Sequence, residues 1–122
     1  MATIERFEDL IVWQRAREVT KRIYQITSGG NFSKDFGLRD QIRRSSVSIM
    51  ANVAEGFGRR SDKEFSSFLN IAHGSVAETQ SHAYVAMDPG YLAKADFQQL
   101  YVELDEISRM TMGLTKHLWN VR

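Results

Sequence analysis

The sequence predicts an all-α protein, folded as an antiparallel four-helix bundle in up-down-up-down order. Three observations lead to this prediction. In four successive segments, apolar residues recur with helical periodicity, and in three of them they follow alternating steps of four and three that place them on one face of a helix. Glycine, proline and asparagine signals separate the segments, and no strand-like alternation of any length appears. The expected helices are 7–27, 34–57, 62–88 and 93–119.

The first, third and fourth helices each carry an apolar stripe. The first ends in the loop signal of residues 27–31 (TSGGN), and the third ends in the turn signal of residues 88–91 (DPGY). The third begins with a capping pattern, in which the Ser61 hydroxyl is expected to accept from the backbone N–H of Glu64. The stripes consist of Val12, Ala16, Val19, Ile23 and Ile26; of Phe65, Leu69, Ala72, Val76, Thr79, Ala83 and Ala86; and of Leu100, Leu104, Ile107, Thr111, Leu114, Leu118 and Val121.

The second helix is different because both of its sides carry residue types that suit close packing. Its apolar half consists of Ile42, Val47, Ile49, Met50, Val53, Ala54 and Phe57. Its other side is a straight polar line: Gln41, Ser45, Ser48, Asn52 and Glu55. Short hydroxyls and amides let a neighbouring helix come close and still find hydrogen-bond partners. The alternative is that the line faces water at some cost in helix propensity, but the absence of lysine from it favours contact.

The two packed sides of the second helix lead to a prediction about assembly. One bundle is expected to cover only one of them. The sequence therefore predicts a homo-oligomer in which the polar line is the candidate interface.

Composition places the chain among ordinary globular proteins. It has 122 residues, 43% apolar and 25% charged, and is expected to form a single domain over residues 1–122. The longest strongly apolar run, residues 10–13, is too short to cross a bilayer, and the N-terminus lacks the plan of a signal peptide. There is no cysteine, which excludes disulfides and thiolate metal sites. We expect a cytoplasmic protein without a membrane partner.

The sequence offers no catalytic or metal-binding constellation. Paired metal sites in bundles need Glu-x-x-His on inward faces, but the residues three positions before the histidines are Asn70, Thr79 and Leu114. Glu78 and His82 are four residues apart and are expected to form a surface pair. Neither a phosphate-binding glycine loop nor a glycine-flanked serine elbow is present. We therefore expect no enzyme activity, no cofactor and no metal.

Basic residues are the remaining functional signal. The net charge is only +1, but residues 34–60 hold six cations against three acids, whereas residues 61–88 hold one against four. An antiparallel bundle brings the end of the first helix next to the start of the second, so the cations gather at two ends. One set is Lys21, Arg22, Lys34, Arg39, Arg43 and Arg44, and the other is Arg59, Arg60, Lys63, Lys116 and Arg122.

Two interpretations of these cations remain open. The first is an oligomer that binds nucleic acid through phosphate contacts, with Arg39, Arg43, Arg44, Arg59, Arg60 and Lys63 as the candidates. No basic stretch is interleaved with aromatic residues, so reading of base sequence is not expected. The second is a structural or protein-interaction scaffold, in which arginines of the second helix pair with acids such as Glu55 and Glu78.

Several segments carry a family resemblance. They are residues 7–16 (FEDLIVWQRA), 41–44 (QIRR), 48–49 (SI) and 52–56 (NVAEG), followed by Arg59, Phe65, Phe68, Leu69, Ile71, Ala72, Gly74, Ser75 and Glu78. Through these positions, which extend over nearly the whole chain, the sequence resembles the four-helix-bundle protein family of the 23S rRNA intervening sequences.

The resemblance implies a bacterial four-helix bundle without catalytic activity, commonly assembled as a homopentameric ring. Some members are encoded within insertions in 23S rRNA genes. The accessory proteins of diversity-generating retroelements are similar in fold and assembly, and they bind nucleic acid and a reverse transcriptase. The implied partners are therefore further copies of the chain, RNA or DNA, and a nucleic-acid enzyme. Three positions depart from the family pattern, namely Ser45, His73 and Ala93, and they leave the expected fold intact.

Overall fold

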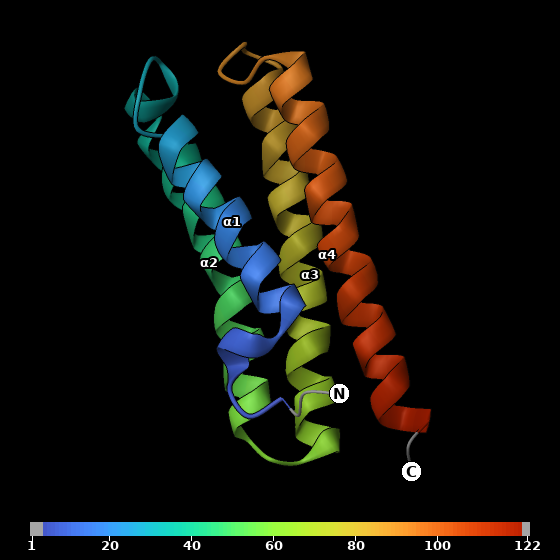
Figure 1. Cartoon of the computed structure of the whole chain (residues 1–122). Helices are drawn as coiled ribbons and strands as arrows, with labels where there is room; N and C mark the ends of the chain where they lie inside the picture. Colours follow the sequence, from blue (N-terminus) through green and yellow to red (C-terminus); the bar gives the residue numbers. More distant parts are fainter. Residues whose placement is uncertain (1–3, 121–122) are drawn as a thin grey trace.

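The computed structural model describes residues 4–120, with side chains through residue 118. It consists of η1 Phe7–Asp9, α1 Ile11–Ile26, η2 Phe32–Lys34, α2 Phe36–Gly58, α3 Asp62–Met87 and α4 Lys94–Asn120, where η denotes a single 3-10 turn. Successive α-helices run in opposite directions (Figure 1), and the part of the chain that is described contains no strand. The predicted all-α four-helix bundle is confirmed. Val121 and Arg122, which the sequence assigned to a stripe and to a basic set, lie outside the described residues.

The two ends of the bundle are built differently. The α1–α2 connection, residues 27–35, and the α3–α4 connection, residues 88–93, lie at one end, which we call the loop end (Figure 1). The Phe32 and Tyr91 rings stack there, with centroids 5.4 Å apart. The short α2–α3 connection, residues 59–61, forms the opposite end, which we call the corner.

The apolar stripes meet along the bundle axis and form its core. Ile23, Ile42, Leu69 and Leu104, one from each helix, are completely buried. Burial of a side chain of this size contributes about 1.5–3 kcal/mol relative to leaving it exposed. The core therefore supplies the main stabilisation, and it holds α2 between α1 and α3, with its most extensive contact against α3.

The polar line of α2 packs inside the same chain, which corrects part of the sequence interpretation. The Thr79 hydroxyl of α3 donates to the Ser45 hydroxyl at 2.8 Å, and the Ser48 and Ser75 hydroxyls are also 2.8 Å apart. The Asn52 side-chain amide donates to the Ser48 carbonyl at 2.8 Å. The expectation that one bundle covers only one side of α2 is therefore wrong for these serines, because α3 covers them while the apolar side faces the core.

Helices α2 and α3 approach most closely near the corner, and Gly56 makes this possible. A Cβ added at Gly56 would lie 2.6 Å from the Phe68 Cβ, closer than real contacts allow, and 3.0 Å from the Phe65 ring, which is a tight contact. The chain then reverses through Arg60, whose φ of 62° is in the left-handed region that glycine usually occupies. The sequence predicted that this helix ends at residue 57, and α2 ends one residue later, at Gly58.

Candidate nucleic-acid interface

Arg43 is fixed at the loop end by neutral groups alone. Its Nε donates to the Thr27 hydroxyl at 2.7 Å, and its Nη2 donates to the Ser28 hydroxyl at 3.2 Å. Its guanidinium also lies over the Tyr24 ring, 4.5 Å from the centroid. The predicted meeting of the end of α1 with the start of α2 is confirmed by these contacts. Because none of the three groups is an acid, the positive charge of Arg43 is positioned but not neutralised.

Two further arginines of α2 extend this positive region. The Arg39 guanidinium lies over the Phe36 ring at 4.9 Å, donates to the Ser33 carbonyl at 3.2 Å, and pairs with Asp40 at 3.1 Å. Arg44 is exposed and has no ion-pair or hydrogen-bond partner among the described residues. Arg44 is thus free to contact an anion, and Arg39 shares its charge with an exposed acid.

Two arginines of α1 are neutralised by acids of α4, and one of them, Arg22, was expected near this end. Arg22 forms an ion pair and hydrogen bond with Glu103, and Arg15, two helical turns earlier along α1, lies 3.9 Å from Glu106. Both contacts connect α1 to α4, the pair of neighbouring helices that packs least extensively. Arg22 therefore belongs to the fold, and the positive set at the loop end is smaller than the sequence predicts.

The corner residues lie far from this set and have a different environment. Sixteen residues of helix separate Arg43 from Arg59, which corresponds to about 24 Å along the axis. Arg59 pairs with Glu55 at 3.1 Å and stacks over Phe68 at 5.1 Å. Lys63 is exposed in the first turn of α3, next to the acid Glu64. The structure therefore divides the six candidate cations into two separate groups.

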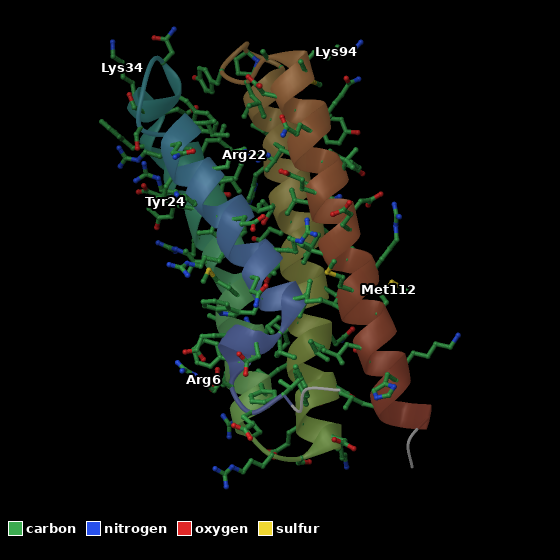
Figure 2. The ribbon with its side chains drawn as sticks, in the orientation of Figure 1. Arg6, Arg22, Tyr24, Lys34, Lys94 and Met112 are labelled. Atoms are coloured by element: carbon green, nitrogen blue, oxygen red, sulfur yellow. The ribbon has the colours of Figure 1, made fainter. Side chains whose placement is uncertain are left out.

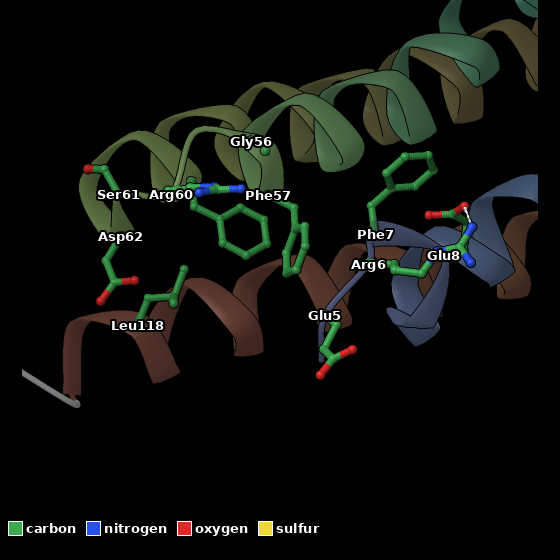
Figure 3. Close-up of a pocket in the computed structure, with 12 residues that line it drawn as sticks. Glu5, Arg6, Phe7, Glu8, Gly56, Phe57, Arg60, Ser61, Asp62 and Leu118 are labelled. Atoms are coloured by element: carbon green, nitrogen blue, oxygen red, sulfur yellow. Dashed lines mark hydrogen bonds and ion pairs between the residues drawn. The ribbon is translucent and has the colours of Figure 1, made fainter. Parts of the chain in front are cut away.

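Arg60 borders a hollow of about 820 Å³ at the corner, and the hollow is mixed in charge. Figure 3 shows its side chain turned toward the hollow beside Phe57. Glu5, Arg6 and Glu8 line the same space, and Arg6 pairs with Glu8. The hydrogen bond from Arg6 lowers the pKa of Glu8 below its usual value, so this carboxylate stays ionised near the entrance. These acids weaken the attraction of the corner for phosphate.

The residues of the polar line differ in how deeply they are buried. Ser45 is buried and Ser48 and Asn52 are half-buried, whereas Gln41 and Glu55 at the two ends of the line are exposed. Between residues 44 and 58, the exposed positions that form the outward face of α2 are Arg44, Val47, Ala51, Glu55 and Gly58. A second helix would therefore meet this outward face before it met the serines.

The two histidines of α3 have different surroundings. His73 of α3 contacts two hydroxyls of α4, with Nδ1 3.0 Å from the Ser108 Oγ and 3.3 Å from the Thr111 Oγ1. His82 Nε2 lies 3.7 Å from Glu78, so the two residues are neighbours as predicted, but this nitrogen is buried and the pair is not fully at the surface. Within residues 4–118 no three His, Asp or Glu side chains lie close enough together to hold a metal ion.

Exposed aromatic rings beside the cations were missed by the sequence analysis. Phe36 is 64% exposed at the first residue of α2, and Tyr24 is 43% exposed on α1. Figure 2 shows Tyr24 and Lys34 on the same side of the bundle toward the loop end. The sequence offered a partial signal, because Phe36 lies two residues from Lys34. Tyr24 and Arg43 come together only through the packing of α1 on α2.

Fold and surface together define a four-helix-bundle protein with two separate groups of cations on α2 and the start of α3. The chain belongs to the family described as 23S rRNA-intervening sequence protein, whose model matches residues 8–113. A crystal structure of a protein of unknown function from the S23 ribosomal protein family of Bacteroides thetaiotaomicron VPI-5482 is similar to it. That structure has a TM-score of 0.78 and 27% sequence identity over 87% of this chain and 99% of the other.

Two negative findings accompany this similarity. No functionally curated protein matches the sequence. Among residues 4–120, no helix is both long enough and apolar enough to cross a membrane.

Proposed function

We propose that this protein is a non-catalytic, homo-oligomeric nucleic-acid-binding protein of the bacterial cytoplasm. It binds RNA or DNA through the arginines of α2, and the corner makes a smaller contribution. We take the assembly to be a pentamer because the family resemblance implies that number. A nucleic-acid enzyme is the further partner that the resemblance suggests.

The contacts of Arg43 give the main support for nucleic-acid binding. Its partners are two hydroxyls and a phenol ring, and its neighbour Arg44 has no partner in the described chain. A scaffold protein would be expected to pair such arginines with acids of its own helices, as Arg22 is paired with Glu103. Arginines that are held in place and left unneutralised suit phosphate binding, because the guanidinium loses little freedom when the phosphate arrives.

Assembly is supported by the outward surface of α2 and α3. Val47 is 39% exposed on α2, and Ile71 is 51% exposed on α3. Ala51 and Gly74 are exposed on the same two helices, and a Cβ at Gly74 would meet nothing within 4 Å. A face with small residues beside exposed aliphatic ones allows another copy to pack closely.

The alternative function is a structural or protein-interaction scaffold. The pairing of Arg59 with Glu55 favours it, because this arginine of the corner is already neutralised within the chain. In a scaffold, acids of a neighbouring copy would pair with Arg43 and Arg44 in the same way. The two functions differ in whether the assembled protein binds nucleic acid at low salt.

The binding test uses structured RNA and duplex DNA over a range of salt concentrations. For the parent protein we expect affinity to fall as salt rises. For Arg43→Gln with Arg44→Gln we expect the slope of log affinity against log salt concentration to flatten by roughly 0.7–0.9 for each phosphate that the variant no longer neutralises. The matched control is Arg15→Gln with Arg22→Gln, which removes the same charge from arginines that face α4 acids. Absence of binding by the parent at low salt would reject the nucleic-acid function and leave the scaffold.

The assembly test is light scattering at micromolar concentration. We expect a mass several times the 14.0 kDa of one chain. Val47→Arg is expected to reduce this mass without loss of helical circular dichroism, because Val47 faces outward. Ser48→Arg does not separate loss of assembly from loss of folding, because the Ser48 hydroxyl is 2.8 Å from the Ser75 hydroxyl inside the chain. A mass of one chain at all concentrations would contradict self-association.

A further inference from the structure

The loop end contains a hollow that the phosphate contacts proposed above do not use. It has a volume of about 610 Å³, within the range of pockets that hold small organic groups. The hollow lies where the start of α2 meets the α3–α4 connection, so segments that are distant in sequence form its walls. It is lined by Asn31, Lys34, Asp35, Phe36, Gly37 and Tyr91.

Two aromatic rings border this hollow. Phe36 is 64% exposed, although it is the first residue of a helix whose buried apolar residues face the core. The Arg39 guanidinium lies over its ring, and Arg39 itself does not line the hollow. Gly37 has no side chain beside the ring, and a Cβ there would meet nothing within 4 Å. The Phe36 ring is therefore supported and remains accessible.

Tyr91 is the second ring, and its position is fixed by three contacts. It stacks on the buried Phe32 ring with an interplanar angle of 29°, and its backbone N–H donates to the Ala86 carbonyl at 3.0 Å. Its hydroxyl interacts with the Asp35 carboxylate, and this carboxylate accepts from the backbone N–H of Leu38 at 3.2 Å. This wall of the hollow thus forms in the free protein, which lowers the ordering cost of binding a ligand.

The charges around the hollow indicate which part of a ligand fits inside it. The Asp35 carboxylate lines the hollow, so a phosphate inside it would meet a negative charge. Lys34 is the cation on the same lining, and it is exposed and without an ion-pair partner in the described chain. A flat, uncharged group with an attached phosphate satisfies both conditions, with the phosphate next to Lys34.

We propose that this hollow binds one unpaired base of a nucleic-acid strand, which stacks against Phe36 while its backbone phosphate contacts Lys34. This inference rests on the nucleic-acid binding proposed above and adds a class of ligand, namely single-stranded or looped nucleic acid. A base paired in a duplex keeps its faces stacked on its neighbours and does not enter such a hollow. The exposed side-chain amide of Asn31 supplies a donor and an acceptor for the base edge.

The experiment compares two probes that carry the same phosphates. One is a deoxythymidine single strand, and the other is the same strand with abasic residues, each measured by fluorescence anisotropy at one salt concentration. The parent is expected to bind the strand with bases roughly tenfold more tightly, since base stacking on an aromatic ring contributes about this much. Phe36→Ala is expected to remove that preference, so that the two strands bind with equal affinity, even if the loss of the ring beneath Arg39 weakens binding of both strands alike.

Two variants control for indirect effects. Phe36→Trp keeps an aromatic surface and is expected to retain the preference. Met112→Ala removes a side chain that is 58% exposed on α4, far from Lys34 (Figure 2), and is expected to behave as the parent. Because Phe36 is mostly exposed, the alanine variant is expected to keep the helical circular dichroism of the parent.

The outcomes separate this inference from the function on which it rests. Equal affinity of the parent for the two strands, or a preference that survives in Phe36→Ala, would overturn the base site and leave phosphate binding intact. Absence of binding to either strand at low salt would overturn both.

Discussion

The loop end and the corner each hold cations of the α2 region, but the groups around these cations differ in charge. At the loop end, Arg43 is held by hydroxyls and the exposed Tyr24 ring. At the corner, Arg59 is paired with an acid, and Arg60 borders a hollow that acids line. The number of cations at each end is therefore a poor guide to phosphate binding, because the groups that contact each cation determine how far its charge is neutralised.

The two ends also differ in how tightly they are packed. Substitution of one glycine at each end is expected to show this difference with the largest effect. Gly56→Ala at the corner is expected to lower the free energy of unfolding by about 1–3 kcal/mol, because the new Cβ would lie 2.6 Å from the Phe68 Cβ. Gly37→Ala at the loop end meets nothing within 4 Å and is expected to raise it by about 0.5–1 kcal/mol. Urea unfolding measures both changes, and equal effects would contradict the difference in packing.

A pair of helix caps gives the next largest contrast. Asp35 caps α2 at the loop end and also interacts with the Tyr91 hydroxyl, whereas Ser61 caps α3 at the corner through one 3.3 Å bond. We expect Asp35→Ala to lower the free energy of unfolding by about 2 kcal/mol and Ser61→Ala by about 1 kcal/mol. Thermal unfolding of the two variants checks the order, and a larger loss for Ser61→Ala would show that the Tyr91 contact adds nothing.

The smallest expected effect is a dependence of stability on alkaline pH. Burial and the hydrogen bond to Asp35 raise the pKa of Tyr91 above its usual value of 10.0. The neutral phenol is therefore favoured in the folded protein. Its stabilisation is complete below pH 10 and is lost as pH rises through the folded pKa. The free energy of unfolding of the parent should thus fall more steeply above pH 10 than that of Tyr91→Phe. Parallel curves of this free energy against pH would contradict a raised pKa of Tyr91 in the folded protein.

The sequence predicted the bundle because periodic burial is a local property of each segment. Ile42, Leu69 and Leu104 are fully buried on the stripes that contain them. The spacing of Ser45 and Ser48 indicated close packing correctly, but it could not indicate that the partner is α3 of the same chain. A one-dimensional pattern marks the face that is contacted and leaves open what contacts it.

The candidate site was less predictable because its character comes from contacts between distant residues. Thr27 and Arg43 are sixteen positions apart, and Phe32 and Tyr91 belong to different connections. The sequence found the arginines at the loop end and missed that neutral groups hold Arg43. It also treated the corner as equivalent, because the presence of Glu5 and Glu8 in the same hollow as Arg60 depends on how the N-terminal segment folds back.

The most direct test of the account compares the salt dependence of nucleic-acid binding when each end loses two arginines. The variants are Arg43→Gln with Arg44→Gln at the loop end and Arg59→Gln with Arg60→Gln at the corner, which remove the same charge. We predict that the loop-end variant flattens the slope of log affinity against log salt by roughly 1.4–1.8, the effect of two phosphates, and that the corner variant changes it by less than half as much. A slope unchanged in the loop-end variant, or a larger change in the corner variant, would contradict it.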